Sequence, residues 1–328
     1  MNKAIIFIVI LILLYTSVFG MDIRLGSVAP KGSPWIKALN QIASDWRQIS
    51  GGKVALKIYP GGMVGDEKEM LRKIKLRQLD AAAMTISGMN QISKGVMAMA
   101  TPMMVSRYGE LEYLFEKLGP HFEDQMKKQR YVVLAWIFIG WTYFFSKAKV
   151  STPNDMRGRS IWVLSSNQSE IQAWKSAGVN PVPMSVQDVL LSLQSGKLDN
   201  LYATMTTAAA FQWFGIADHM LDMHWAPMVA GFLVSSTVWD KVPMEYREEM
   251  LKAAQKAGEQ VSRESLEIDN QALATMKEYG LKIHSPSVED KAQWKALMDE
   301  YLDIIIDKEF GRESYELVKK TLSEYPGK

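Results

Sequence analysis

Few residues of this chain have the types and spacing that chemistry requires. The clearest grouping is His219, Asp222 and His224, whose imidazole and carboxylate groups are common metal ligands. Two histidines five residues apart do not share a helical face, and His121 and His284 are remote in sequence. The chain has no cysteine, which excludes disulfides, thiol catalysis and thiolate metal sites. We therefore predict no metal site and no cofactor.

The carboxylates Glu67 and Glu69 have the types needed for acid–base catalysis, but they fall in the first turn of a predicted helix. Negative charge is favourable there, so we expect both side chains to be solvated. The glycine-rich stretch 60–65 lacks the Gly-Lys-Ser/Thr ending of a phosphate loop and predicts a turn. Neither a Gly-x-Ser-x-Gly elbow nor a His-Glu-x-x-His motif occurs. We predict that the protein is not an enzyme, and a secreted hydrolase is the least favoured alternative.

An uncharged aromatic residue occupies the position where ligand contact is most expected. Residues 155–164 form a turn around Gly158 that carries Arg157 and Arg159, followed by an apolar strand that contains Trp162. In open α/β sheets, ligands lie just beyond the carboxyl ends of the strands. We therefore expect Trp162 to face a ligand, and the two arginines to lie on the turn before the strand.

The elements that would position Trp162 follow an alternating β-α pattern. Residues 23–84 read as three strands separated by two helices, the second of which begins at a capping pair, Asp66 and Glu69. The uncharged run 131–146 predicts two buried strands joined by a bend, and a second β-α-β group spans 161–203. This alternation predicts an α/β fold with mainly parallel sheets. A strand at 229–236 and a helix of some 36 residues from Met244 to Tyr279, with a break near Ser262–Ser265 left open, complete the pattern.

The N-terminus predicts export. Lys3 precedes an apolar run that ends in small residues at Gly20, which is typical of a secretory signal peptide. An uncleaved membrane anchor is the alternative, since residues 4–19 are close to the length of a spanning helix. The net charge of +2, with interspersed signs, gives no basic surface for nucleic acid.

Four motifs, in this order, resemble those of solute-binding proteins of tripartite ATP-independent periplasmic (TRAP) transporters, the DctP-type P subunit. They are Tyr-Pro-Gly-Gly-Met-Val-Gly-Asp-Glu at 59–67, Asp-Met-Arg-Gly-Arg-Ser-Ile at 155–161, Pro-Val-Pro-Met-Ser at 181–185, and the helix and turn at 189–199. The resemblance implies a two-lobed periplasmic protein with hinge strands, a long helix spanning both lobes, and a ligand held between them. It also implies delivery of the solute to an ion-gradient-driven membrane permease.

The expected division of the chain follows from this resemblance. Residues 1–20 form the signal peptide, 21–139 plus 228–267 form lobe I, and 140–227 plus 268–328 form lobe II.

The departures from the family pattern carry the functional prediction. Relatives that bind carboxylates hold the ligand with arginines in a two-pronged salt bridge. The matching positions here are Trp162 and Thr142, and Ala203 replaces an asparagine common in the family. Burying an anion without a charged or multiply hydrogen-bonded partner costs several kcal/mol. We therefore predict a hydrophobic or amphipathic solute.

The predicted ligand-binding residues come from the ends of strands in both lobes. They are Val28, Met84, Thr85, Trp141, Thr142, Trp162, Leu164, Met184, Val186, Tyr202 and Ala203. A second hypothesis is an interaction protein whose ligand cleft has decayed. Some branches of the family work with a periplasmic tetratricopeptide-repeat protein, and the absence of both arginines is compatible with such a partner.

Overall fold

The computed structural model describes residues 20–164 and 168–327. The predicted signal peptide, apart from Gly20, and the segment Ser165-Ser166-Asn167 after the Trp162 strand lie outside the described residues. Among the residues described, no helix is both long and apolar enough to span a bilayer.

In the described part of the chain, the first sheet contains five strands in the order β2-β1-β3-β10-β4. They are Met21–Ser27 (β1), Val54–Tyr59 (β2), Ala81–Thr85 (β3), Tyr131–Trp141 (β4) and Pro227–Ser235 (β10). The strand β1 pairs in parallel with β2 and β3, whereas β10 runs antiparallel between β3 and β4. This is the parallel β-α-β group predicted for residues 23–84, extended by the two strands that cross between the sheets.

The second sheet contains six strands within the described residues, in the order β11-β9-β5-β8-β6-β7. They are Tyr143–Ser146 (β5), Ser160–Leu164 (β6), Asn180–Met184 (β7), Asn200–Ala203 (β8), His219–Leu221 (β9) and Lys282–His284 (β11). The strand β6 pairs in parallel with β7 and β8. The mixed α/β fold with two sheets is confirmed.

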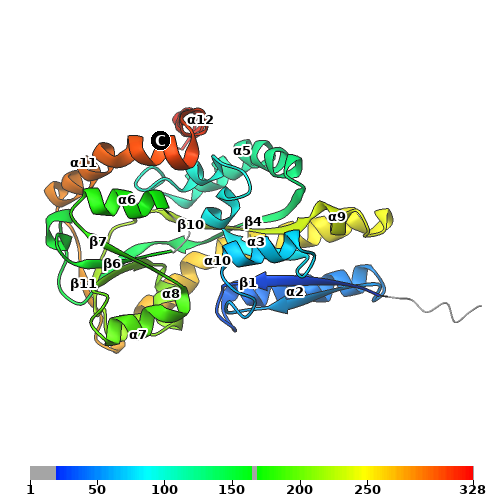
Figure 1. The fold of residues 1–328 in the computed structure, drawn as a ribbon, viewed down its shortest axis with the longest axis horizontal. Helices are drawn as coiled ribbons and strands as arrows, with labels where there is room; N and C mark the ends of the chain where they lie inside the picture. The colour runs from blue at the N-terminus through cyan, green and yellow to red at the C-terminus, as the bar shows by residue number, and fades with distance from the viewer. Residues whose placement is uncertain (1–19, 165–167, 328) are drawn as a thin grey trace, which may run out of the picture.

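Helices cover both sheets. Their bounds are Pro34–Ile49 (α2), Glu67–Lys75 (α3), Ile86–Asn90 (α4), Val96–Ala100 (η1), Tyr108–Lys128 (α5), Pro153–Met156 (η2), Gln168–Ser176 (α6), Val186–Asp188 (η3), Val189–Gln194 (α7), Met205–Ala210 (α8), Trp213–Gly215 (η4), Ser236–Trp239 (α9), Met244–Glu278 (α10), Val288–Ile305 (α11), Ile306–Phe310 (η5) and Arg312–Ser323 (α12). Figure 1 shows β1 and α2 on one side of the molecule and β6, β7 and β11 on the other, with α10 passing between the two groups.

The chain crosses between the sheets at two adjacent points, and Thr142 joins them. Its backbone N–H and its hydroxyl group both donate to the carbonyl oxygen of Ala226 at 2.9 Å, and its hydroxyl oxygen accepts from the Ala226 N–H at 3.1 Å. The N–H of Trp225 donates to the Thr142 carbonyl oxygen at 2.9 Å. The outgoing strand, β4 to β5, and the returning strand β10 are therefore bonded to each other between the sheets.

The helix α10 runs without a break through Ser262–Ser265 and contacts β4 of the first sheet as well as the helices α2 and α8. It has 35 residues, a length of roughly 52 Å at 1.5 Å per residue. Gly258 permits close packing on the first sheet, since an added Cβ would lie 2.9 Å from the carbonyl oxygen of Trp136 in β4. One turn later, the Ser262 hydroxyl accepts a 2.9 Å hydrogen bond from the N–H of Phe138. The long helix that joins the two lobes is therefore fixed to β4 by both packing and hydrogen bonding.

The last helices, α11 and α12, also connect the two halves of the molecule. The helix α11 packs on α6 beside the second sheet, whereas α12 packs on α5 beside the first. The Arg107 guanidinium at the start of α5 donates to the carbonyl oxygen of Gly327 at 2.9 Å. The predicted division at 139/140, 227/228 and 267/268 stays a prediction, and α12, which it assigns to lobe II, lies against α5.

Candidate functional site

Two adjoining chambers lie between the sheets. Chamber one is enclosed by the segment 28–35, the start of α3 and the end of β3 on one side, and by β6, residues 185–187, β8 and α8 on the other. Chamber two lies between α4 and η1 on one side and α6 and α11 on the other, and the chain crossings at 142 and 225–228 also border it. Thr85, Leu164, Tyr202 and Met228 line both chambers. We call these four residues the waist.

The chambers have apolar walls without a cation. Among the described residues that line chamber one, Asp66 and Glu67 are the only acidic or basic side chains, and in chamber two Glu170 is the only one. Neither described lining includes an arginine, a lysine or a histidine. The site therefore carries carboxyl groups of its own and offers no salt-bridge partner to a carboxylate ligand.

Eight of the eleven predicted ligand-binding residues border these chambers. They are Val28, Thr85, Thr142, Trp162, Leu164, Val186, Tyr202 and Ala203. They come from the ends of strands in both sheets, as the α/β fold leads one to expect. Their contact with a ligand stays a prediction.

The other three predicted residues line neither chamber. Met84 is fully buried in β3, where side chains alternate between faces, so that its neighbour Thr85 points to the cleft instead. Trp141 is buried with its ring stacked on His224 at a centroid distance of 4.6 Å. Met184 is buried at the end of β7, where its carbonyl oxygen accepts a hydrogen bond. These three residues belong to the packed core.

Trp162 forms part of the wall of chamber one. The indole is only 6% exposed, and its Nε1–H donates to the Met184 carbonyl oxygen at 3.2 Å. The ring stacks on Tyr202 and meets Trp213 edge-on, at centroid distances of 5.9 and 5.4 Å. Because its hydrogen-bonding group is satisfied inside the protein, Trp162 presents an apolar surface to the chamber.

Glu67 is not solvated, and the prediction for it was wrong. The side chain is 6% exposed and lines chamber one. The Thr85 N–H donates to one carboxyl oxygen at 2.5 Å, and the Thr85 hydroxyl donates to the other at 2.9 Å. Burial raises the pKa of Glu67 to about 7, against the lowering effect of these hydrogen bonds. The helix-capping pattern identified Asp66 correctly, but it did not reveal that the next residue turns inward.

A second polar pair, half-buried, reaches the waist from the opposite lobe. The Tyr202 hydroxyl donates to one carboxyl oxygen of Glu170 at 2.9 Å, and the Trp174 Nε1–H donates to the other at 3.2 Å. Burial and the neighbouring Glu170 raise the pKa of Tyr202 well above its usual value. The phenol therefore stays neutral, and its side chain borders both chambers.

Two tryptophans that border chamber one have unused donors. The Nε1 atoms of Trp35 and Trp213 are buried and have no hydrogen-bond partner among the described residues. A buried N–H group without an acceptor costs about 1–3 kcal/mol. Neither residue was predicted as part of the site, and nothing in their local sequence distinguishes them from core tryptophans.

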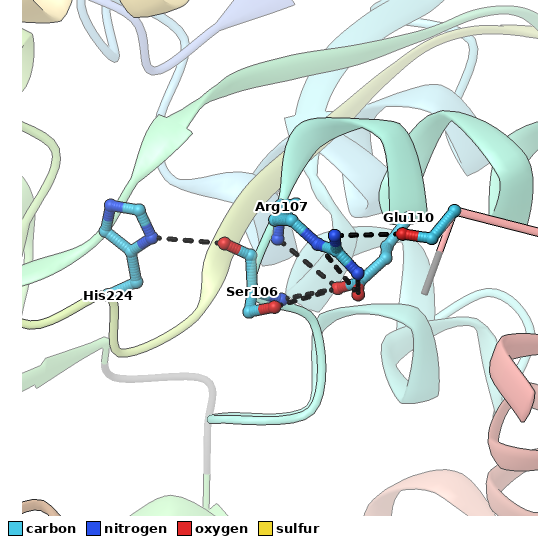
Figure 2. A network of polar contacts seen from close by, with 5 residues as sticks. Ser106, Arg107, Glu110 and His224 are labelled. Atoms are coloured by element: carbon cyan, nitrogen blue, oxygen red, sulfur yellow. Dashed lines mark hydrogen bonds and ion pairs between the residues drawn. The ribbon is translucent and has the colours of Figure 1, made fainter. Parts of the chain in front are cut away.

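The histidines considered as metal ligands make contacts within the protein. The His224 Nδ1–H donates to the Ser106 carbonyl oxygen at 3.4 Å, next to the Glu110 network at the start of α5 (Figure 2). Burial lowers the pKa of His224, which favours its neutral form. His219 and His284 stack, with Nδ1 and Nε2 2.7 Å apart. No cluster of three or more metal-ligating side chains occurs among the described residues.

The two lobes touch at the mouth of the cleft. The side-chain amide of Gln187, which follows β7, donates to the carbonyl oxygen of Gly61, which follows β2, at 3.1 Å. A Cβ added to the neighbouring Gly62 would lie 2.1 Å from the Gln187 Nε2 atom. A larger residue at position 62 would therefore displace the Gln187 amide from this contact.

Comparison with known proteins gives a consistent result. The model of the family "Bacterial extracellular solute-binding protein, family 7" (DctP) matches residues 25–309. The chain is 22% identical to the sialic acid-binding periplasmic protein SiaP of Vibrio cholerae, over 81% of this chain and 84% of the relative. It is 21% identical to the C4-dicarboxylate-binding protein DctB of Bacillus subtilis, over 90% of this chain and 86% of the relative.

Solved structures share the fold. A sugar acid binding protein of Advenella mimigardefordensis in complex with galactonate superposes with a TM-score of 0.87 at 17% identity, covering 93% of this chain and 99% of that one. A TRAP periplasmic solute binding protein of Chromohalobacter salexigens with bound D-glucuronate gives a TM-score of 0.84 at 20% identity, with 92% and 99% covered.

Proposed function

The chain belongs to family 7 of the bacterial extracellular solute-binding proteins, the DctP family, and we propose that, unlike the relatives named above, it captures a neutral, largely apolar solute between its lobes. Members of this family are periplasmic solute-binding proteins of TRAP transporters, which work with membrane permease subunits. The chain would deliver its solute to such a permease. Its role is capture and release, and the proposal includes no catalytic step.

The charge of the cleft carries the proposal. The described residues that line the two chambers include Asp66, Glu67 and Glu170 but no basic side chain. A carboxylate ligand there would lose its hydration without gaining a cationic partner, and it would lie near groups of its own charge. A neutral apolar ligand has neither cost, and it gains roughly 25 cal/mol for each Å² of apolar surface removed from water.

The polar groups of chamber one suit a neutral oxygen. The unpartnered indole N–H groups of Trp35 and Trp213 are donors, whereas the Glu67 carboxyl group can accept or, when protonated, donate. An alcohol oxygen both accepts and donates hydrogen bonds, so it complements both kinds of group. This supports an amphipathic ligand whose polar end is a hydroxyl group.

The proposed ligand departs from those named for the relatives. The names and structures above concern sialic acid, C4-dicarboxylates, galactonate and D-glucuronate, all of which carry a carboxylate. At 17–22% identity these proteins share the fold with this chain, while the cations expected for such ligands are absent from the described lining. The tetratricopeptide-repeat partner stays a prediction that rests on the missing arginines alone.

Native mass spectrometry of the purified full-length protein tests this function. Spectra recorded before and after extraction with organic solvent should show the loss of a small apolar molecule. The stripped protein should then bind 1-dodecanol but not D-glucuronate. A sugar acid as the co-purifying ligand would overturn the proposal. So would a stripped protein that binds no apolar probe, which would instead favour the decayed-cleft hypothesis.

A further inference from the structure

The cleft continues beyond the chamber that Trp162 borders. The four waist residues line both chambers, so chamber two adjoins chamber one at the waist. Three of the four, Leu164, Tyr202 and Met228, offer apolar atoms or a ring, and the fourth, Thr85, has its hydroxyl bonded to Glu67. The Tyr202 hydroxyl is bonded to Glu170, so the polar atoms of the waist already have partners and a chain of methylene groups there would meet mainly apolar atoms.

The walls of chamber two are built for apolar contact. Trp174 and Trp225 come from the second lobe, and Met97 and Ala100 come from η1 of the first. The far wall consists of Leu297, Met298, Tyr301 and Ile305 of α11 together with Phe310. Glu170, the one charged residue among its described lining residues, is already bonded to Tyr202 and Trp174. Chamber two therefore offers aromatic and aliphatic surface to whatever enters it.

We infer that the site has two chambers and takes an elongated amphipathic molecule, with its hydroxyl end in chamber one and its hydrocarbon tail across the waist in chamber two. This inference rests on the proposed function and specifies its ligand by length. The relatives' sugar acids and dicarboxylates are compact, and a ligand of that size would leave one chamber unfilled. The second chamber also gives α11 a part in ligand contact, which no feature of the sequence indicated.

The chain offers a matched pair of variants. Ala173 on α6 borders only chamber two, and Ala210 on α8 borders only chamber one. Leucine substitutes for alanine in a helix at little cost in helix propensity. Ala173→Leu and Ala210→Leu therefore add the same side-chain volume at the wall of one chamber each.

The test is titration calorimetry of the full chain with 1-hexanol and 1-dodecanol. Each methylene that enters an apolar site should tighten binding by about fourfold. Wild type should therefore prefer the longer alcohol strongly. Ala173→Leu should lower the affinity for 1-dodecanol by at least about tenfold and leave the affinity for 1-hexanol unchanged. Ala210→Leu should lower the affinity for both alcohols.

The outcomes separate this inference from the proposed function. If wild type binds neither alcohol, the proposed function and the inference both fail. If wild type binds both alcohols but Ala173→Leu binds 1-dodecanol as wild type does, the apolar function stands and the second chamber is refuted. Circular dichroism of each variant confirms that a loss of binding is not a loss of folding.

Discussion

The Gln187 amide donates to the Gly61 carbonyl oxygen at 3.1 Å, and this hydrogen bond joins the two lobes at the mouth of the cleft. The residues belong to segments that follow strands of different sheets, 126 positions apart in sequence. A contact of this kind forms only when the lobes are close together. It should therefore slow the escape of a ligand from chamber one, which Gln187 also lines.

Two neighbouring glycines allow this contact to be tested. Gly61 and Gly62 both have a positive φ, 65° and 73°, so alanine at either position has a similar backbone strain. At Gly61 nothing lies within 4 Å of the added Cβ, whereas at Gly62 it would displace the Gln187 amide. Gly62→Ala should speed the release of bound 1-dodecanol by roughly threefold to tenfold, as the loss of one hydrogen bond predicts.

Stopped-flow tryptophan fluorescence gives the release rate, and Gly61→Ala is the control. Equal rates for the two glycine variants would contradict a role for the contact. In a Gln187→Ala background, Gly62→Ala should have no further effect on release.

Trp162 should define the preference for a neutral ligand. Trp162→Phe keeps an apolar ring but loses the hydrogen bond to the Met184 carbonyl oxygen, so it should fold with a stability loss of about 1 kcal/mol. It should bind 1-dodecanol and not D-glucuronate. Trp162→Arg should gain affinity for D-glucuronate by about tenfold or more, since a guanidinium pairs with a carboxylate through two hydrogen bonds. If Trp162→Arg folds, as judged by circular dichroism, but does not bind D-glucuronate, residue 162 does not face the ligand.

Glu67 should make stability depend on pH. Its pKa is about 7 in the folded protein and near 4.5 in an unfolded chain. Between these values the folded state binds more protons, so the free energy of unfolding falls as pH rises, by up to about 3 kcal/mol above pH 7. Glu67→Gln removes this pH-dependent change in the free energy of unfolding, and the glutamine oxygen can still accept the hydrogen bond from the Thr85 N–H. It should be more stable than wild type near pH 8 and lose that advantage near pH 5.

Urea unfolding at the two pH values measures this effect. If the difference in the free energy of unfolding between Glu67→Gln and wild type is the same at both pH values, the buried carboxyl group does not titrate in this range.

Asp269 should hold α8 against the long helix. It is 3% exposed on α10 and accepts from the N–H and hydroxyl of Thr206 at 2.9 and 2.6 Å. Burial raises its pKa to about 6. Asp269→Asn keeps an acceptor for Thr206 and should unfold near wild-type temperature at pH 5. Asp269→Ala leaves the buried N–H unpaired and should lose about 1–3 kcal/mol.

Hydrogen exchange at the Thr206 amide provides a local measurement. The amide should exchange faster in Asp269→Ala and remain protected in Asp269→Asn. Equal protection in both variants would mean that α8 is held by packing alone.

Much of the fold could be predicted from the sequence because local patterns determined it. The Asp66 cap bonds the Glu69 N–H as expected, and the uncharged run 131–146 forms β4 and β5 with the bend at Thr142. The position of Thr142 in the family pattern suggested a ligand-binding residue. That role stays a prediction. The Thr142 hydroxyl also joins segments 84 positions apart, a pairing that no local spacing reveals.

The site was harder to predict because it is formed by distant segments. Glu67 is turned inward by Thr85, 18 residues later, and chamber two is closed by α11, more than 100 residues after α6. Neither relationship leaves a periodic signal in the sequence. Met84 and Thr85 show how small an error in position can be and still matter. They are adjacent residues of one strand, yet Met84 faces the core and Thr85 faces the cleft.

The central claim is that this cleft accepts a neutral amphipathic molecule because its described lining has carboxyl groups and no cation. Isothermal titration of the ligand-stripped protein with 1-dodecanol and with D-glucuronate tests it most directly. The account predicts saturable binding of 1-dodecanol, with a negative heat-capacity change from apolar burial, and no binding of D-glucuronate. Saturable binding of D-glucuronate without binding of 1-dodecanol would contradict it.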